Sequence, residues 1–150
     1  MLIQSGPESW ATESVKRIRE RCRTDLLYLT AEVLSEAGVD AGLYEKNLLK
    51  TPCQFHIEAA RIVESGVDAL ILAPRIHIKT GLVTTGGGIQ SVLKDPNWRN
   101  LLISETPMLV SKVLREIVWH FAENKRLRTL FPEYRVDSHD EDGTKTTFDV

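Results

Sequence analysis

Apolar residues recur at helical spacing along most of the chain, and their pattern predicts five helices. In the third, Phe55, Ala59, Ile62 and Val63 stand at positions i, i+4, i+7 and i+8, which places them on one helix face. A Thr-Pro pair opens the third and the fifth helix, as a cap and a first helical residue do, and Gly66 ends the third. The predicted helices span residues 7–23, 24–37, 51–66, 79–94 and 106–124.

Two short apolar runs predict strands instead. Residues 69–73 and 101–104 are nearly continuous apolar stretches, which is typical of strands buried on both faces. Each run precedes a predicted helix, and this order makes the two strands parallel, with a right-handed crossover. The predicted fold class is therefore α/β, with parallel strands and crossover helices preceded by N-terminal helices. The glycine triplet 86–88 marks a place where the helix 79–94 could break.

Composition and charge exclude several classes of protein. The 150 residues carry 19 Lys and Arg against 21 Asp and Glu, so the net charge of −2 gives no bulk attraction to nucleic acid. No apolar stretch is long enough for a membrane span, and the first residues do not resemble a signal peptide. Cys22 and Cys53 are too few and too far apart for a disulfide framework, which indicates a reducing, cytosolic setting.

The turn between the first predicted strand and its helix carries the strongest chemical signal. A phosphate-binding loop needs a strand, a loop with converging N–H groups, and a helix that begins with a lysine and a hydroxyl residue. Lys79 and Thr80 stand at that helix start, whereas Ala73 and Ile78 occupy the two glycine positions of the usual pattern. On spacing alone, nucleotide binding and an ordinary helix start remain equally open.

Several motifs in the same order resemble the N-terminal ATPase region of bacteriophage terminase large subunits. The resemblance covers about residues 23–134, and the family's deviant phosphate loop has the form A-P-R-G-H-x-K-[ST]. Ile76 departs from that form, because it stands where the family has glycine. The matching stretches are residues 70–80, 93–99, 102–106 and 130–133.

The resemblance implies a P-loop ATPase and gives each loop residue a role. Lys79 would hold the β and γ phosphates of ATP, Thr80 the Mg²⁺ ion, and Arg75 would stabilise the transferring phosphoryl group. Gln54 begins the segment 54–56, which lies where the family contacts adenine. The rest of the implied phosphate loop consists of Pro74, Ile76, His77 and Ile78.

The implied function is that of a viral DNA-packaging motor, which couples ATP hydrolysis to translocation of duplex DNA. Its implied partners are double-stranded DNA, the portal, the small terminase subunit and further copies of the large subunit, with no membrane, in the cytoplasm of an infected bacterial host. The family's Walker B motif is an apolar strand ending in two acidic residues, and no such strand follows Thr80. We therefore expect the 150-residue chain to be inactive by itself, as the beginning of a terminase that stops before Walker B.

The domain interpretation follows from these motifs. It has an N-terminal helical segment at 1–50, a partial P-loop ATPase domain at 51–134 and an acidic tail or truncated continuation at 135–150. Two alternatives remain open: a degenerate, non-catalytic α/β interaction module, and a helicase-like P-loop ATPase.

Other chemistry-bearing residues have simpler explanations. Cys53 and His56 form a C-x-x-H pair, but no second pair completes a zinc site, so a core cysteine is expected. His120 lies between aromatic residues on an apolar helix, which favours packing. The basic stretch 16–23 favours a solvated helix face over a contact with DNA phosphates.

Overall fold

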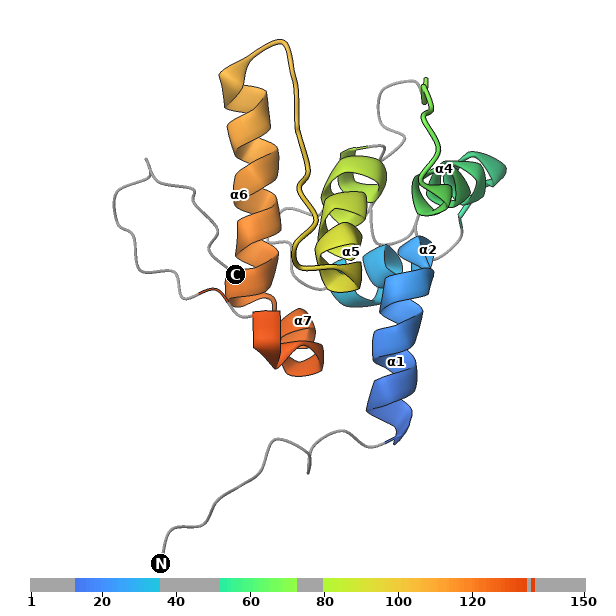
Figure 1. The fold of residues 1–150 in the computed structure, drawn as a ribbon, viewed down its shortest axis with the longest axis vertical. Coiled ribbons are helices and arrows are strands. Elements are labelled where there is room, and N and C mark those ends of the chain that lie inside the picture. The colour runs from blue at the N-terminus through green and yellow to red at the C-terminus, as the bar shows by residue number, and fades with distance from the viewer. Residues whose placement is uncertain (1–12, 36–51, 73–79, 135, 137–150) are drawn as a thin grey trace, which may run out of the picture.

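The computed structural model describes residues 13–35, 52–72, 80–134 and 136 (Figure 1). Helices account for 74% of these residues, and no strand or sheet occurs among them. None of the described helices has both the length and the apolar character that crossing a bilayer requires.

The five predicted helices appear in the predicted order with shifted ends, the helix 24–37 as α2 and η1, whereas α7 and η3 were not predicted. Two of them, η1 and η2, have the wider π-type turn, and each joins an α-helix at one end: η1 follows α2, and η2 leads into α5. The elements are α1 (Glu13–Thr24), α2 (Leu26–Tyr28), η1 (Leu29–Leu34), α4 (Gln54–Ser65), η2 (Thr80–Gly86), α5 (Gly87–Lys94), α6 (Pro107–Glu123), α7 (Lys125–Leu130) and the 3-10 turn η3 (Pro132–Tyr134).

Helix caps explain where α2 and α4 begin and end. Asp25 separates α1 from α2, and its carboxylate accepts the N–H of Tyr28 at 2.8 Å. Cys53 caps α4 with the help of His56, whereas the predicted cap Thr51 lies outside the described residues. Gly66 ends α4 with φ 66°, a left-handed conformation that glycine adopts without strain, and this confirms the predicted stop.

The predicted α/β fold, with its parallel strands, is wrong for the part of the chain that the structure describes. Residues 67–72 and 98–104 have no regular secondary structure. Their outward side chains are open to solvent: Leu70 is 83% exposed and Ile103 84%. A strand is stable only beside a neighbour that pairs with its backbone, and the described residues supply no such neighbour. The apolar runs are present, but the helices alone form the core.

The helix formed by η2 and α5 runs through the centre of that core. Its buried face carries Leu82, Ile89 and Leu93, which are fully buried, and it packs against α1, η1, α4 and α6. Apolar residues of α1 and α2, among them Cys22 and Leu26, belong to the same core.

The glycine triplet does not break this helix, and its neighbours explain why glycine stands there. A Cβ atom on Gly86 would lie 2.4 Å from Thr30 Cγ2, one on Gly87 3.0 Å from Val63 Cγ1, and one on Gly88 3.1 Å from Ile117 Cδ1. Because successive residues point about 100° apart around a helix, the three glycines face η1, α4 and α6 in turn. They allow three helices to approach the same central one.

Candidate functional site

The predicted phosphate site lies at the beginning of the central helix. Thr80 is the first residue of η2 and is exposed. The helix that should follow a phosphate loop is therefore present, while the strand that should precede the loop is not formed. The other predicted loop residues lie outside the described part of the chain: Pro74, Arg75, Ile76, His77, Ile78 and Lys79.

An anion site near Thr80 would need free N–H groups at the start of the central helix, whose first described residue is Thr80. The N–H groups in the first turn of a helix have no acceptor within that helix, and the helix dipole is positive at this end. Further along the same helix, Thr85 and Gln90 are buried, and Gln90 Nε2 donates to the carbonyl of Cys22 at 3.4 Å. The central helix is therefore anchored in the core, while the side chain of Thr80 is exposed.

Of the segment expected to contact adenine, only Gln54 is well exposed. Its Nε2 donates to Glu58 Oε1 at 2.8 Å on the surface of α4. His56, by contrast, is 1% exposed, and its Nδ1 lies 3.2 Å from the Cys53 N–H that it accepts. Within the described residues no hydrogen bond joins Gln54 to Thr80, so the two predicted contacts are not linked directly.

Cys53 is not the buried core cysteine that the sequence predicts. It is exposed at the N-cap of α4 with its Sγ 3.4 Å from His56 Nδ1, and the core cysteine is Cys22 instead. Burial raises the pKa of the Cys22 thiol to about 11. Among the described residues no group of three or more His, Cys, Asp or Glu side chains could share a metal ion.

The arginines of α1 hold the helix in place, a role that sequence reasoning missed. Arg19 forms an ion pair with Glu133, and its guanidinium lies 5.0 Å from the centre of the Phe131 ring. Arg23 Nε donates to the Leu93 carbonyl at 2.8 Å. Arg21 lies 3.4 Å from Asp25 Oδ2 and 4.0 Å from the centre of the Tyr28 ring. Arg19, Arg21 and Arg23 are thus engaged within the molecule, although Arg21 also stays exposed, as Lys16 and Arg17 do.

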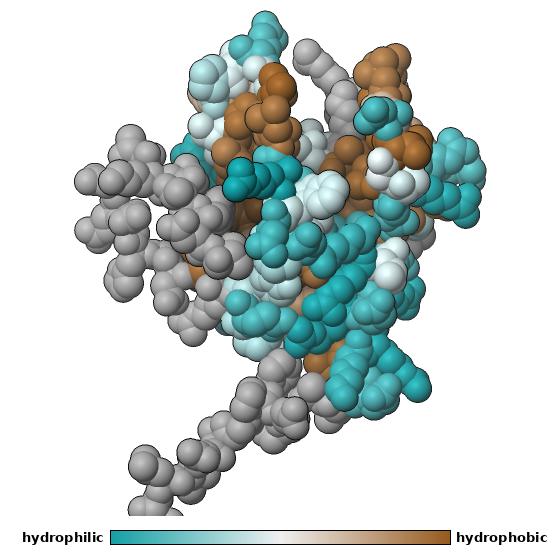
Figure 2. Space-filling model, in the orientation of Figure 1, coloured by the Kyte–Doolittle hydropathy of each residue, from teal (hydrophilic) through white to brown (hydrophobic). Residues whose placement is uncertain are grey.

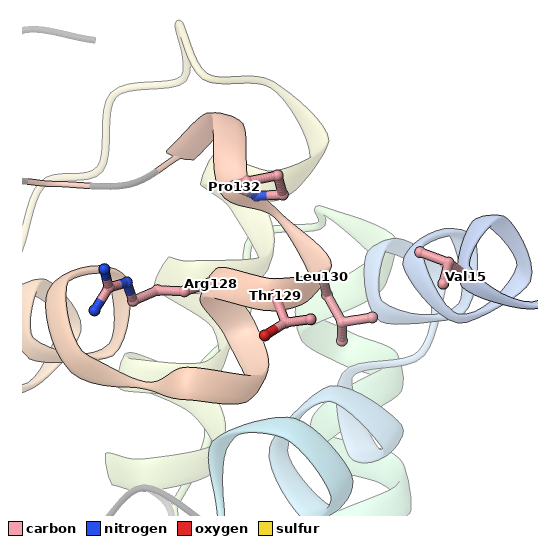
Figure 3. A pocket seen from close by; sticks show the side chains of 5 residues that line it. All are labelled: Val15, Arg128, Thr129, Leu130 and Pro132. Atoms are coloured by element: carbon pink, nitrogen blue, oxygen red, sulfur yellow. The ribbon is translucent and has the colours of Figure 1, made fainter. Parts of the chain in front are cut away.

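Two hollows lie away from the predicted site. The smaller, about 330 Å³, lies between α1 and α7; Figure 3 shows Val15, Leu130 and Pro132 around it, while Arg128 points away. The larger, an open groove of about 1530 Å³, runs between the central helix, α6 and the segment 95–102. Neither is lined by Thr80 or Gln54.

His120 is a buried structural residue, as its sequence context predicts. It is 5% exposed, and burial lowers the pKa of its imidazole to about 4, so the ring is neutral at pH 7. Asn124 Nδ2 lies 3.0 Å from His120 Nδ1, which therefore acts as the acceptor.

No family model, no curated protein and no solved structure matches the chain. The terminase resemblance therefore rests on the motifs quoted above and remains a prediction.

Proposed function

We propose that the chain binds Mg²⁺-ATP through Lys79 and Thr80 and works in a DNA-packaging motor of the terminase large-subunit type. The observation that carries the proposal is that Thr80, the residue directly after the lysine of the loop motif, is exposed in the first described turn of the central helix. In a phosphate loop, the unpaired N–H groups of a helix start, a hydroxyl and a lysine act together on the phosphates.

In the proposed site the groups that contact phosphate come from a loop and a helix, although the strand expected before the loop is not formed in residues 67–72. Phosphate binding uses backbone N–H groups, a lysine charge and a hydroxyl for the metal, and all of these come from residues 74–80. Arg75 is proposed to stabilise the transferring phosphoryl group, and Gln54 to contact the adenine. The exposed position of Gln54 on α4 is compatible with that role.

The motor partners follow from the resemblance and belong to the same proposal. They are double-stranded DNA, the portal, the small terminase subunit and further copies of this chain. Arg19 and Arg23 of α1 make internal contacts, so the proposal assigns DNA binding to basic residues that are exposed. Exposed lysines such as Lys112 on α6 and Lys125 on α7 are free to meet phosphates without breaking an interaction seen in the described residues.

Equilibrium titration with Mg²⁺-ATP tests the site. Lys79→Ala removes a charge-assisted contact to phosphate, which is worth about 1.5 to 3 kcal/mol, so the affinity should fall at least tenfold. Thr80→Val should lower affinity only when Mg²⁺ is present, because it removes a metal ligand and keeps the side-chain shape.

Lys112→Ala is the control, since it removes an exposed lysine from α6, outside the loop motif. The affinity of the Lys112→Ala variant for Mg²⁺-ATP should equal that of the unchanged chain. Equal affinities for the Lys79→Ala and Lys112→Ala variants would remove the phosphate site.

A second candidate, an interaction module without catalysis, is favoured by one observation. Large apolar side chains stand exposed along residues 67–72 and 98–104, and such patches typically mark protein contacts. Absence of any ATP binding, together with self-association, would favour this candidate.

A further inference from the structure

Eight large apolar side chains are exposed in the described residues, on two separate stretches of the chain. Figure 2 shows brown surface gathered in the upper half, whereas the lower half, over α1 and α7, is mostly teal. They belong to the two extended segments and the first turn of α6: Val67, Leu70, Leu72, Trp98, Leu101, Ile103, Met108 and Leu109.

The segment 99–105 presents a strand face without a partner. Leu101 and Ile103 are each 84% exposed, whereas Leu102 between them is half-buried; Leu101 and Leu102 both line the groove beside α5. Asn100 holds the segment in place, because its Nδ2 donates to Ser91 Oγ at 2.8 Å. Among the described residues, the backbone of 99–104 makes no hydrogen bond. The segment therefore has one anchored face and one free edge.

The sequence of residues 99–105 is complementary to a second copy of itself that runs antiparallel. In an antiparallel pair of two such segments centred on Leu102, residue 101 of one copy faces residue 103 of the other, and residue 99 faces residue 105. Leu101 then meets Ile103, and Arg99 meets Glu105. Both charged residues are exposed, and neither has an ion-pair partner among the described residues. Two apolar pairs would thus lie between two pairs of opposite charge.

We propose that two copies of this chain associate through antiparallel pairing of residues 99–105 around a two-fold axis at Leu102. The pairing gives each copy the backbone partner that its own helices do not provide. It also covers the exposed apolar side chains beside it, and the net charge of −2 per copy opposes association only weakly.

Sedimentation equilibrium of the 150-residue chain tests the proposal. We expect a mass twice 16.9 kDa at micromolar concentration, dissociating on dilution. Leu101→Lys with Ile103→Lys should leave a monomer over the same range. The control Ser14→Lys with Thr129→Lys adds the same charge at exposed positions on α1 and α7, and should remain a dimer.

A charge exchange tests the register. Arg99→Glu places like charges opposite each other at both ends of the paired segment and should weaken the dimer about tenfold or more. Arg99→Glu combined with Glu105→Arg restores opposite charges and should restore the dimer. Rescue by this exchange is expected only if residue 99 of one copy faces residue 105 of the other.

Amide hydrogen exchange separates strand pairing from side-chain contact. Because only alternate N–H groups of a strand point to its partner, alternate amides within 101–104 should become protected as concentration rises, while those of α7 keep their rates. Four results would overturn the proposal: a monomer at all concentrations, a dimer that survives the two lysines, a dimer without protection at 101–104, or aggregates that grow beyond two copies. Failure of the double charge exchange would overturn the register.

Discussion

Asn124 links α6, α7 and η1, because every donor and acceptor of its side chain has a hydrogen-bond partner. Its Oδ1 accepts the N–H groups of Arg126 at 3.0 Å and Leu127 at 3.1 Å, which caps α7. Its Nδ2 donates to the carbonyl of Val33 in η1 at 3.0 Å and to His120 Nδ1 at 3.0 Å. An asparagine that is 2% exposed is tolerated in the core because its donors and acceptor are all satisfied.

His120 should make the protein less stable in mild acid. Burial holds the imidazole pKa at about 4 in the folded chain, below its ordinary 6.5, so between these values the unfolded chain binds a proton that the folded chain does not. The stability that neutral His120 contributes to the folded chain is complete above pH 6.5 and is lost as the pH falls towards 4. Between pH 7 and pH 5 we expect a loss of about 2 kcal/mol in the free energy of unfolding.

Urea unfolding at several pH values measures this loss, and His120→Gln is the control. Glutamine offers Asn124 a carbonyl oxygen in place of Nδ1 and does not titrate. The difference in unfolding free energy between the two proteins should therefore shrink in acid. Parallel pH curves for the two proteins would contradict the role given to His120.

At the scale of elements, the central helix η2–α5 allows neighbouring helices to approach its backbone closely on several sides. The space beside Gly86 is the tightest, because a Cβ there would meet both the Thr30 methyl group and the Gly81 carbonyl oxygen, the latter at 3.1 Å. Thr30 itself is held, since its Oγ1 donates to the Leu26 carbonyl at 2.8 Å. Helix propensity therefore gives way to packing at this position.

Gly86→Ala should destabilise the protein by about 1 to 3 kcal/mol, although alanine favours a helix by about 1 kcal/mol. Gly88→Ala is the matched comparison: its Cβ would meet the end of the flexible Ile117 side chain at 3.1 Å, so its effect should be smaller. Thermal unfolding followed by circular dichroism measures both. Thr30→Ser removes the clashing methyl group and should partly rescue Gly86→Ala; equal effects of the two alanines would argue against this packing.

For the whole molecule, binding of nucleotide and its hydrolysis are expected to separate. The proposed phosphate residues are present in the sequence, but no apolar strand after Thr80 ends in the paired acidic residues that orient the attacking water. ATP turnover by the 150-residue chain should therefore equal that of its Lys79→Ala variant. A phosphate-release assay measures both, and clear Lys79-dependent turnover would show that the catalytic carboxylates lie elsewhere in the chain.

The sequence by itself determined the helices, because their signals are local. Apolar spacing, the Thr106-Pro107 pair and Gly66 act within a few residues of the helix ends that they set, and the structure confirms α4, α6 and the continuous helix η2–α5 in the order predicted. The burial of His120 was predictable for the same reason, since its apolar neighbours lie on its own helix. The loop motif and its proposed chemistry were also derived from local order alone.

Only the tertiary structure decided whether the apolar runs became strands, because strand formation depends on a distant backbone partner. Residues 67–72 and 98–104 have the composition of buried strands but no neighbour to pair with in the described residues, so they stay extended and exposed. The glycine triplet and the arginines of α1 show the same dependence. Gly86 is explained by Thr30 and Arg19 by Glu133, partners 56 and 114 positions away in the sequence that local patterns do not identify.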